Sequence, residues 1–191
     1  MAIKSQRHRG GRHRGGFGPL YDSFSTLGSA FDVTQVQILV GLNGENPATP
    51  GASIQVALYN NGAGNTPGSL KQVIGTVLDS ALSTTSFGVV SFNSLSITLA
   101  ADTRYWIGLS SPNTAGLWSV ATDDSGTGVA GEFFSNAGGT SPNVGQPYQM
   151  QVSGDTVTTA TPLPAALPLF VTGLGLLGLI FGGSRWAIRT V

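Results

Sequence analysis

The stretch SIQVALY, residues 53–59, sets the fold class of this chain. Ile54, Val56 and Leu58 alternate with Gln55 and Tyr59, and side chains of a β-strand point to opposite faces in turn. The pattern therefore predicts a strand with one face in an apolar core. Two further stretches repeat it, VTQVQILV at 33–40 with Val36, Ile38 and Val40 inward, and YQMQVSG at 148–154 with Tyr148, Met150 and Val152 inward.

The rest of the central region, residues 17–157, continues in the same way. Further candidate strands are QVIGTVL (72–78), FGVVSF (87–92), SLSITL (94–99), RYWIGLS (104–110) and LWSVAT (117–122). Clusters rich in Gly, Asn and Pro separate them and are typical of turns: NGENPATPG (43–51), NNGAGNTPGS (60–69), SSPNTAG (110–116), DDSGTG (123–128) and NAGGTSPN (136–143). Short strands at this even spacing predict an all-β domain, an antiparallel β-sandwich of jelly-roll-like form.

The composition of the chain excludes several kinds of chemistry. Only 9% of its 191 residues are charged, Gly occupies 28 positions and there is no cysteine, so disulfides, thiolate nucleophiles and Cys-ligated metals are excluded. The charges are also segregated. Residues 1–18 hold five basic residues and no acidic one, whereas all nine acidic residues lie between positions 19 and 160. Blocks of this kind indicate segments with different roles.

Residues 165–183 form a run without a charged side chain, dominated by Leu, Gly, Ala, Ile, Val and Phe. About 19 residues at ~1.5 Å each span ~28 Å, close to the hydrocarbon thickness of a bilayer. Arg185, Trp186 and Arg189 in the basic end, residues 184–191, are suited to the water interface. A buried core helix would show a polar stripe, and this run has none. The segment is predicted to be a single transmembrane helix that anchors the chain in a membrane.

Residues 1–16 are basic and rich in Gly and Arg, and they lack the apolar core of a signal peptide. They are expected to form a disordered tail or to reflect a misplaced start, so that Met1 is not established as the true beginning. The alternative is an Arg/Gly arm that binds RNA, but no aromatic residues are interleaved with the arginines. The positive-inside rule keeps the basic C-terminal end cytoplasmic and the domain outside, so we expect the natural protein to carry an upstream signal peptide.

The C-terminal residues carry a resemblance. TPLPAALPLF (161–170), the apolar run and the basic end resemble the PEP-CTERM sorting signal in its Pro-Leu-Pro variant, although Thr161 stands where Val is typical. The resemblance implies export in a bacterium that makes exopolysaccharide. It also implies recognition at a sorting motif within the linker 158–164, formed by Thr161, Pro162, Leu163 and Pro164, by an exosortase.

The central region carries a second resemblance. FGPLYDSFST (17–26), ASIQVALYNNGAGNTPGSL (52–70), LAADTRYWIGLSS (99–111), WSVATDDSGTGVAG (118–131) and PYQMQVSG (147–154) resemble the choice-of-anchor R domain. That family is a β-rich extracellular module that precedes sorting signals. The resemblance implies no catalytic residues.

An enzyme is not expected. His8 and His13 both lie in the tail, so the domain cannot assemble a Ser-His-Asp or Cys-His arrangement. The acidic residues lie mostly at turns and strand ends, and no motif pairs two of them as a glycosidase requires.

Two features raise the question of binding. Asp123 and Asp124, with Glu132 after them, are a candidate Ca²⁺ site, although an ordinary acidic turn is the favoured interpretation. Trp106 and Trp118 are a candidate platform for a sugar, although core packing is favoured. Arg104 is interpreted as a turn charge or as half of a solvated pair with its neighbour Asp102.

Together these features predict an exported, non-enzymatic protein of the cell envelope or extracellular matrix. Its β domain lies outside a membrane-held anchor, and sorting releases it to the surface or re-attaches it. Two alternatives stay open: a module that binds carbohydrate, namely the exopolysaccharide, and a cytoplasmic tail-anchored protein with an RNA-binding arm. No cofactor other than Ca²⁺ is considered, and nucleic acid is not an expected partner.

Overall fold

A computed structural model describes residues 19–43, 51–110, 116–121, 123–144 and 147–157, together with the backbone of residues 11–14. These residues form antiparallel β-strands and one 3-10 helix, η1 (Asp79–Ala81), which confirms the all-β prediction. The strands are β1 (Gly11–Arg14), β2 (Leu20–Ser25), β3 (Phe31–Leu42), β4 (Ser53–Asn61), β5 (Pro67–Leu78), β6 (Gly88–Phe92), β7 (Ile97–Leu99), β8 (Arg104–Ser110), β9 (Gly116–Val120), β10 (Phe133–Asn136), β11 (Gly139–Pro142) and β12 (Met150–Thr156).

The first sheet is organised around β3, and we call it the β3 sheet. Its order is β1-β9-β3-β12, with β6 and β7 also paired to β3. The twelve residues of β3 make this possible, because β12 pairs with its first part, at residues 31–38, and β9 pairs with residues 40–42. β7 and β6 follow each other along β3 as well. The expected N-terminal tail contributes β1, whose backbone pairs with β9.

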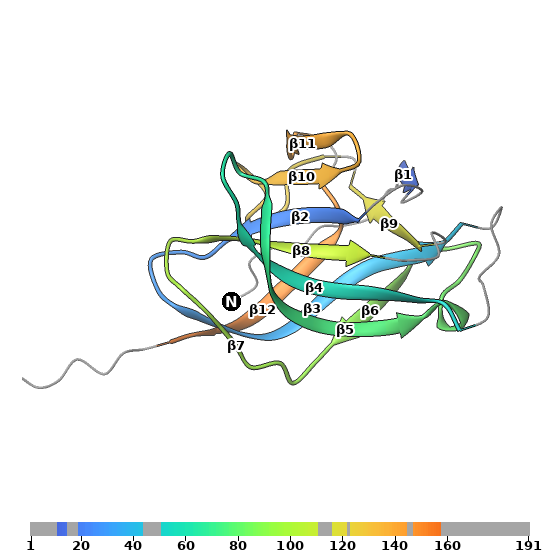
Figure 1. The fold of residues 1–191 in the computed structure, drawn as a ribbon, viewed down its shortest axis with the longest axis horizontal. Helices are drawn as coiled ribbons and strands as arrows, with labels where there is room; N and C mark the ends of the chain where they lie inside the picture. The colour runs from blue at the N-terminus through green and yellow to red at the C-terminus, as the bar shows by residue number, and fades with distance from the viewer. Residues whose placement is uncertain are drawn as a thin grey trace, which may run out of the picture. The chain divides into compact units, whose positions relative to one another are not determined.

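The second sheet, the β8 sheet, has the order β11-β10-β2-β8-β4-β5. Figure 1 shows β10, β2, β8, β4 and β5 following one another across the view. β8 is a central strand, paired with β2 on one side and with β4 on the other, and five of its seven residues are buried. Both faces of β8 are therefore covered.

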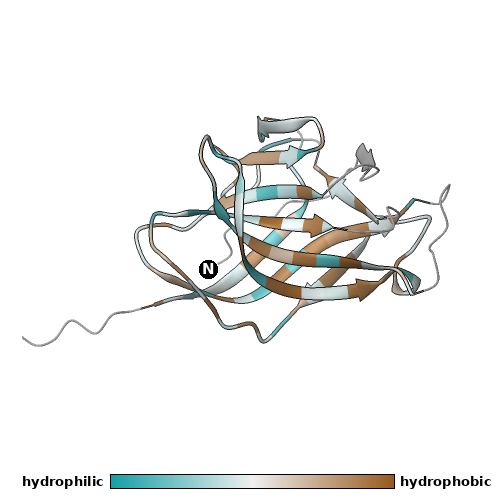
Figure 2. Cartoon of the chain, in the orientation of Figure 1, coloured by the Kyte–Doolittle hydropathy of each residue, from teal (hydrophilic) through white to brown (hydrophobic). Residues whose placement is uncertain are grey.

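One apolar cluster joins the two sheets. The residues predicted to point inward at 33–40, 53–59 and 148–154 are all buried, as are Phe24, Ile107, Leu109 and Trp118. Figure 2 shows the resulting alternation of hydrophobic and hydrophilic residues along several strands. Burial of this apolar area supplies the main driving force for folding.

Two irregularities shape the sheets. The pairing of β12 with β3 shifts register between Ser153 and Gly154, where an added Cβ would lie 1.9 Å from the Asp32 carbonyl oxygen. Only glycine fits this bulge. The second irregularity is β5, an edge strand whose pairing with β4 shifts register at three places and which exposes Leu70, Lys71 and Val73.

The candidate linker, anchor and basic end, residues 158–191, lie outside the described residues. Among the residues that the structure does describe, no helix has the length and apolar character needed to cross a bilayer.

Candidate functional site

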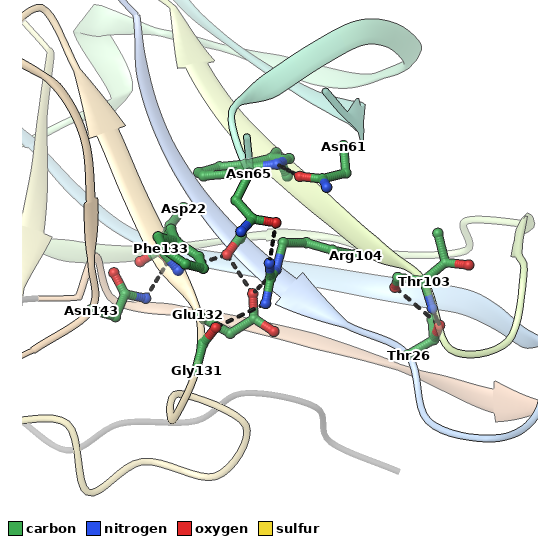
Figure 3. A network of polar contacts seen from close by, with 12 residues as sticks. Asp22, Thr26, Asn61, Asn65, Thr103, Arg104, Gly131, Glu132, Phe133 and Asn143 are labelled. Carbon is green, nitrogen blue, oxygen red and sulfur yellow. Dashed lines mark hydrogen bonds and ion pairs between the residues drawn. The ribbon is translucent and has the colours of Figure 1, made fainter. Parts of the chain in front are cut away.

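The most extensive polar cluster that we find in the described residues surrounds Arg104, the first residue of β8 (Figure 3). Its Nε donates to Glu132 Oε2 at 2.9 Å, Nη1 to Asn65 Oδ1 at 2.6 Å, and Nη2 to the Gly131 carbonyl oxygen at 2.8 Å. The guanidinium carbon also lies 4.8 Å from the centre of the Phe133 ring. A planar fork of donors suits this combination of polar and stacking contacts.

Glu132 is 4% exposed, and Arg104 is not its only partner. Ser23 Oγ on β2 donates to the same oxygen, Oε2, and accepts a hydrogen bond from the Phe133 backbone N–H at 2.8 Å. One buried carboxylate oxygen thus holds a cation and a hydroxyl together. We call Ser23, Asn65, Arg104, Gly131, Glu132 and Phe133 the Arg104 network.

A second buried carboxylate lies near the same end of β2. Asp22 is fully buried, and Asn143 Nδ2 donates to its Oδ1 at 2.7 Å. Burial, and to a lesser degree the charge of Asp22, raises the pKa of the nearby Tyr148 phenol against a hydrogen bond with Asn136 that lowers it. The phenol therefore stays protonated at neutral pH and does not act as a base.

The contacts of the Arg104 network connect separate parts of the fold. Glu132 Oε2 already accepts hydrogen bonds from Arg104 and Ser23, so it is committed to contacts within the fold. The network joins residues from β2, β8, the turn around Asn65 and the segment ahead of β10. It holds these turns against the outer face of the β8 sheet.

Trp106 and Trp118 cannot form the sugar platform considered above, because both side chains are fully buried. Trp106 Nε1 donates to Asn61 Oδ1 at 2.9 Å. Trp118 Nε1 donates to the Gln149 carbonyl oxygen at 2.9 Å, and its ring stacks on that of Tyr148 with centres 4.9 Å apart. Neither ring presents a face to solvent. Trp118 belongs to the core cluster, as the core-packing interpretation expects, whereas Trp106 is buried on the outer face of the β8 sheet.

The candidate Ca²⁺ residues also have other partners. Asp123 is exposed and accepts hydrogen bonds from Ser125 N–H and Oγ at 3.1 and 2.6 Å, an Asx-type turn. Glu132 belongs to the Arg104 network. Across the described ranges, no three His, Asp or Glu side chains come together as a metal-binding group. Asp123, Asp124 and Glu132 are therefore not assembled into one site.

The remaining predicted site residues lie outside the described part of the chain. They are the sorting motif Thr161, Pro162, Leu163 and Pro164, and the membrane-boundary residues Arg185, Trp186 and Arg189.

Sequence reasoning missed two sites. Arg104 pairs with Glu132, 28 positions away, and not with Asp102, and no local pattern indicates this pairing. The second is a hollow on the outer face of the β3 sheet, lined in part by Gln37, Gln149 and Gln151. The sequence did contain a signal for these outward glutamines, because the alternation that directs Val36 and Met150 into the core directs the glutamines beside them outward.

No family model matches the chain, and no curated protein matches it either.

Proposed function

We propose that the chain is an exported, non-enzymatic protein of the bacterial cell envelope or extracellular matrix, with its β domain held outside a membrane by the C-terminal segment. The observation that carries this proposal is the run at 165–183, which has bilayer length and no charge and is followed by Arg185, Trp186 and Arg189. Such a run is poorly accommodated in water and well accommodated in lipid.

The domain is compatible with a module whose role is display rather than catalysis. Residues 17–157 contain neither histidine nor cysteine, and the buried Glu132 is committed to the Arg104 network. Successive strands pass between the sheets, from β2 to β3 and back to β4, and again from β7 to β8 and β9. This exchange supports the finer assignment of a jelly-roll-like sandwich.

Sorting at the Pro-Leu-Pro motif completes the proposal. Residues 161–170 resemble the PEP-CTERM signal, so an exosortase is the expected partner and the domain is released or re-attached after recognition. Proline restricts its own backbone and that of the residue before it, and Pro162 and Pro164 stand just ahead of the apolar run in the sequence.

Fractionation of the producing cell tests the membrane proposal. The intact chain is expected in the membrane fraction, with its β domain degraded by protease added outside spheroplasts. A chain ending at residue 157 is the matched control and is expected to leave the membrane fraction. An intact chain in the soluble fraction, with residues 165–183 still attached, contradicts the proposal.

A double substitution tests the sorting step separately. Pro162→Ala with Pro164→Ala is expected to leave the C-terminal segment attached, as read by the mass of the surface form. Pro168→Ala, which alters a proline beyond the motif, is the control and is expected to be processed. Equal processing of all three chains rules out recognition of the motif while leaving the membrane proposal intact.

Binding of carbohydrate is a second candidate function. The buried Trp106 and Trp118 do not support it, but the amide side chains on the outer face of the β3 sheet do.

A further inference from the structure

The outer face of the β3 sheet carries amide and hydroxyl side chains. Gln35 and Gln37 on β3 face outward, as do Gln149, directly before β12, and Gln151 within it. Gln37 lies opposite Gln151 in the register. Hydroxyl partners fix two of these amides. Gln37 Nε2 donates to Ser91 Oγ at 2.9 Å, and Gln151 Nε2 donates to Ser153 Oγ at 3.3 Å.

A hollow of about 110 Å³ opens in this face. Its lining residues are three glutamines and four apolar residues: Gln37, Gln149, Gln151, Ile38, Leu39, Val89 and Met150. No lining residue is charged. Space of this size accommodates several water-sized groups, which is the scale of part of a sugar ring.

Gln149 is the unusual member of the lining. It is 4% exposed, yet its Nε2 has no hydrogen-bond partner among the described residues. The backbone around it is fixed, because its N–H donates to Ser119 O at 2.8 Å and its carbonyl oxygen accepts from Leu39 N–H and Trp118 Nε1. A buried amide nitrogen without a partner is costly, and native proteins rarely leave one.

The chemistry of the lining defines the ligand. Amides both donate and accept hydrogen bonds, as sugar hydroxyls do. Val89, 64% exposed at the rim, and Leu39 offer apolar surface to the C–H groups of a sugar ring. Because no lining residue carries a charge, nothing there compensates the desolvation of a carboxylate or phosphate.

We propose that this hollow binds one residue of an uncharged polysaccharide, and that a rotation of the buried Gln149 side chain brings its Nε2 to a sugar hydroxyl oxygen. Gln37 and Gln151 orient the ring from the rim, and Leu39 and Val89 contact its apolar side. The proposal adds a ligand to an exported module. It does not depend on export, since binding is measured on the purified chain.

Titration calorimetry on the full chain in detergent tests the site. The probes are three neutral hexasaccharides, cellohexaose, maltohexaose and mannohexaose, with an oligogalacturonate as the acidic comparison. At least one neutral probe is expected to bind, and the acidic probe is not. Gln149→Leu is expected to weaken binding about tenfold or more while the midpoint of thermal unfolding stays or rises, because the substitution removes an unpaired buried amide.

Two further variants keep the test decisive. Gln72→Leu makes the same change on the exposed edge strand β5 and is expected to leave binding unaltered. Val89→Arg places a bulky cation at the exposed rim, so it is expected to abolish binding without loss of the fold. The proposal is overturned if no neutral probe binds at millimolar concentration, if only the acidic probe binds, or if Gln149→Leu and Val89→Arg both bind as the parent chain does.

Discussion

The outer faces of the two sheets differ in how they meet solvent. On the β8 sheet, Trp106 lies fully buried and the Arg104 network holds turns on the same face. On the β3 sheet, Gln35, Gln37 and Gln151 remain partly accessible, and their partners are short side chains on the same sheet, such as Asn93 and Ser91.

The difference teaches that large aromatic residues do not mark the accessible face of this domain. Its Trp106 and Trp118 are buried, and its accessible face carries glutamine, serine and threonine side chains together with the exposed Val89. The covered face is therefore expected to govern stability and the open face to govern recognition. Substitutions on the covered face should therefore change the free energy of unfolding more than substitutions on the open face. This free energy is measured on the full chain by urea titration in detergent.

Trp106→Ala should have the largest effect. It removes a fully buried ring and leaves Asn61 Oδ1 without its 2.9 Å donor, so the free energy of unfolding should fall by about 3–5 kcal/mol. Val89→Ala on the open face is the control and should change it little. A loss below about 1 kcal/mol for Trp106→Ala would show that the β8 sheet is not covered as described.

Arg104→Met should follow, with a loss of about 3 kcal/mol, because it leaves the buried Glu132 carboxylate without its cation. The double variant Arg104→Met with Glu132→Leu should recover part of this loss, since no buried charge then remains. If the two substitutions were simply additive, Arg104 and Glu132 would not act as a unit.

Asp79, directly after β5, is a buried carboxylate whose two oxygens have no partner among the described residues. Burial raises its pKa above the usual range, so the folded chain takes up the proton before the unfolded chain does. The charged group opposes folding above the raised pKa, and this penalty fades as the pH falls toward the unfolded value. Asp79→Asn should therefore raise the free energy of unfolding at pH 7 by roughly 1 kcal/mol and flatten its acid-side pH dependence.

Asp123→Asn is the matched control for that experiment. Hydrogen bonds from Ser125 lower the pKa of Asp123, so its charged form favours the folded state and the substitution should act in the opposite direction. If Asp79→Asn instead lowers the free energy of unfolding at neutral pH, the charged Asp79 carboxylate has a stabilising interaction in the folded chain.

Gln35→Ala on the open face should have the smallest effect, within about 0.5 kcal/mol, although Gln35 Nε2 donates to Asn93 Oδ1 at 2.6 Å. Both residues keep contact with water, which replaces a lost exposed bond. A loss above 1 kcal/mol would mean that this face, too, is structural.

Much of the strand pattern could be predicted from alternation. The strand expected at 104–110 coincides with β8, and those at 33–40, 53–59 and 148–154 lie within or largely overlap strands whose inward residues are buried. Alternation works where one face is apolar, because the core then fixes which residues point inward.

Strand segments without an apolar face were missed. The second half of β5 was predicted at 72–78, but its first half, from Pro67, lies in a stretch interpreted as a turn and residues 69–73 are exposed, so no apolar face marks it. The β10–β11 hairpin was also missed, because NAGGTSPN was interpreted as a turn throughout. Only the two residues between β10 and β11 form the turn, and β11 lies within that stretch. β2 gave no alternating signal, because Asp22 and Ser23 are both buried in it.

The sites were harder to predict than the strands. Arg104 and Glu132 meet through the pairing of β2 with both β8 and β10, a tertiary relation that neither sequence neighbourhood contains. The glutamines of the open face were visible as the outward half of two alternating stretches. Only the pairing of β3 with β12 makes them neighbours, and only the structure shows that Gln149 is buried.

The irregular pairing of β5 has a consequence for chains displayed close together. The edge strand of a regular sheet presents unpaired N–H and C=O groups at even spacing, and a strand of a neighbouring molecule can pair with them. Three register shifts along β5 interrupt this even spacing. The exposed Lys71 also repels the same residue of a second copy, because both carry a positive charge. Neighbouring copies of the chain are therefore expected not to extend the β8 sheet along this edge.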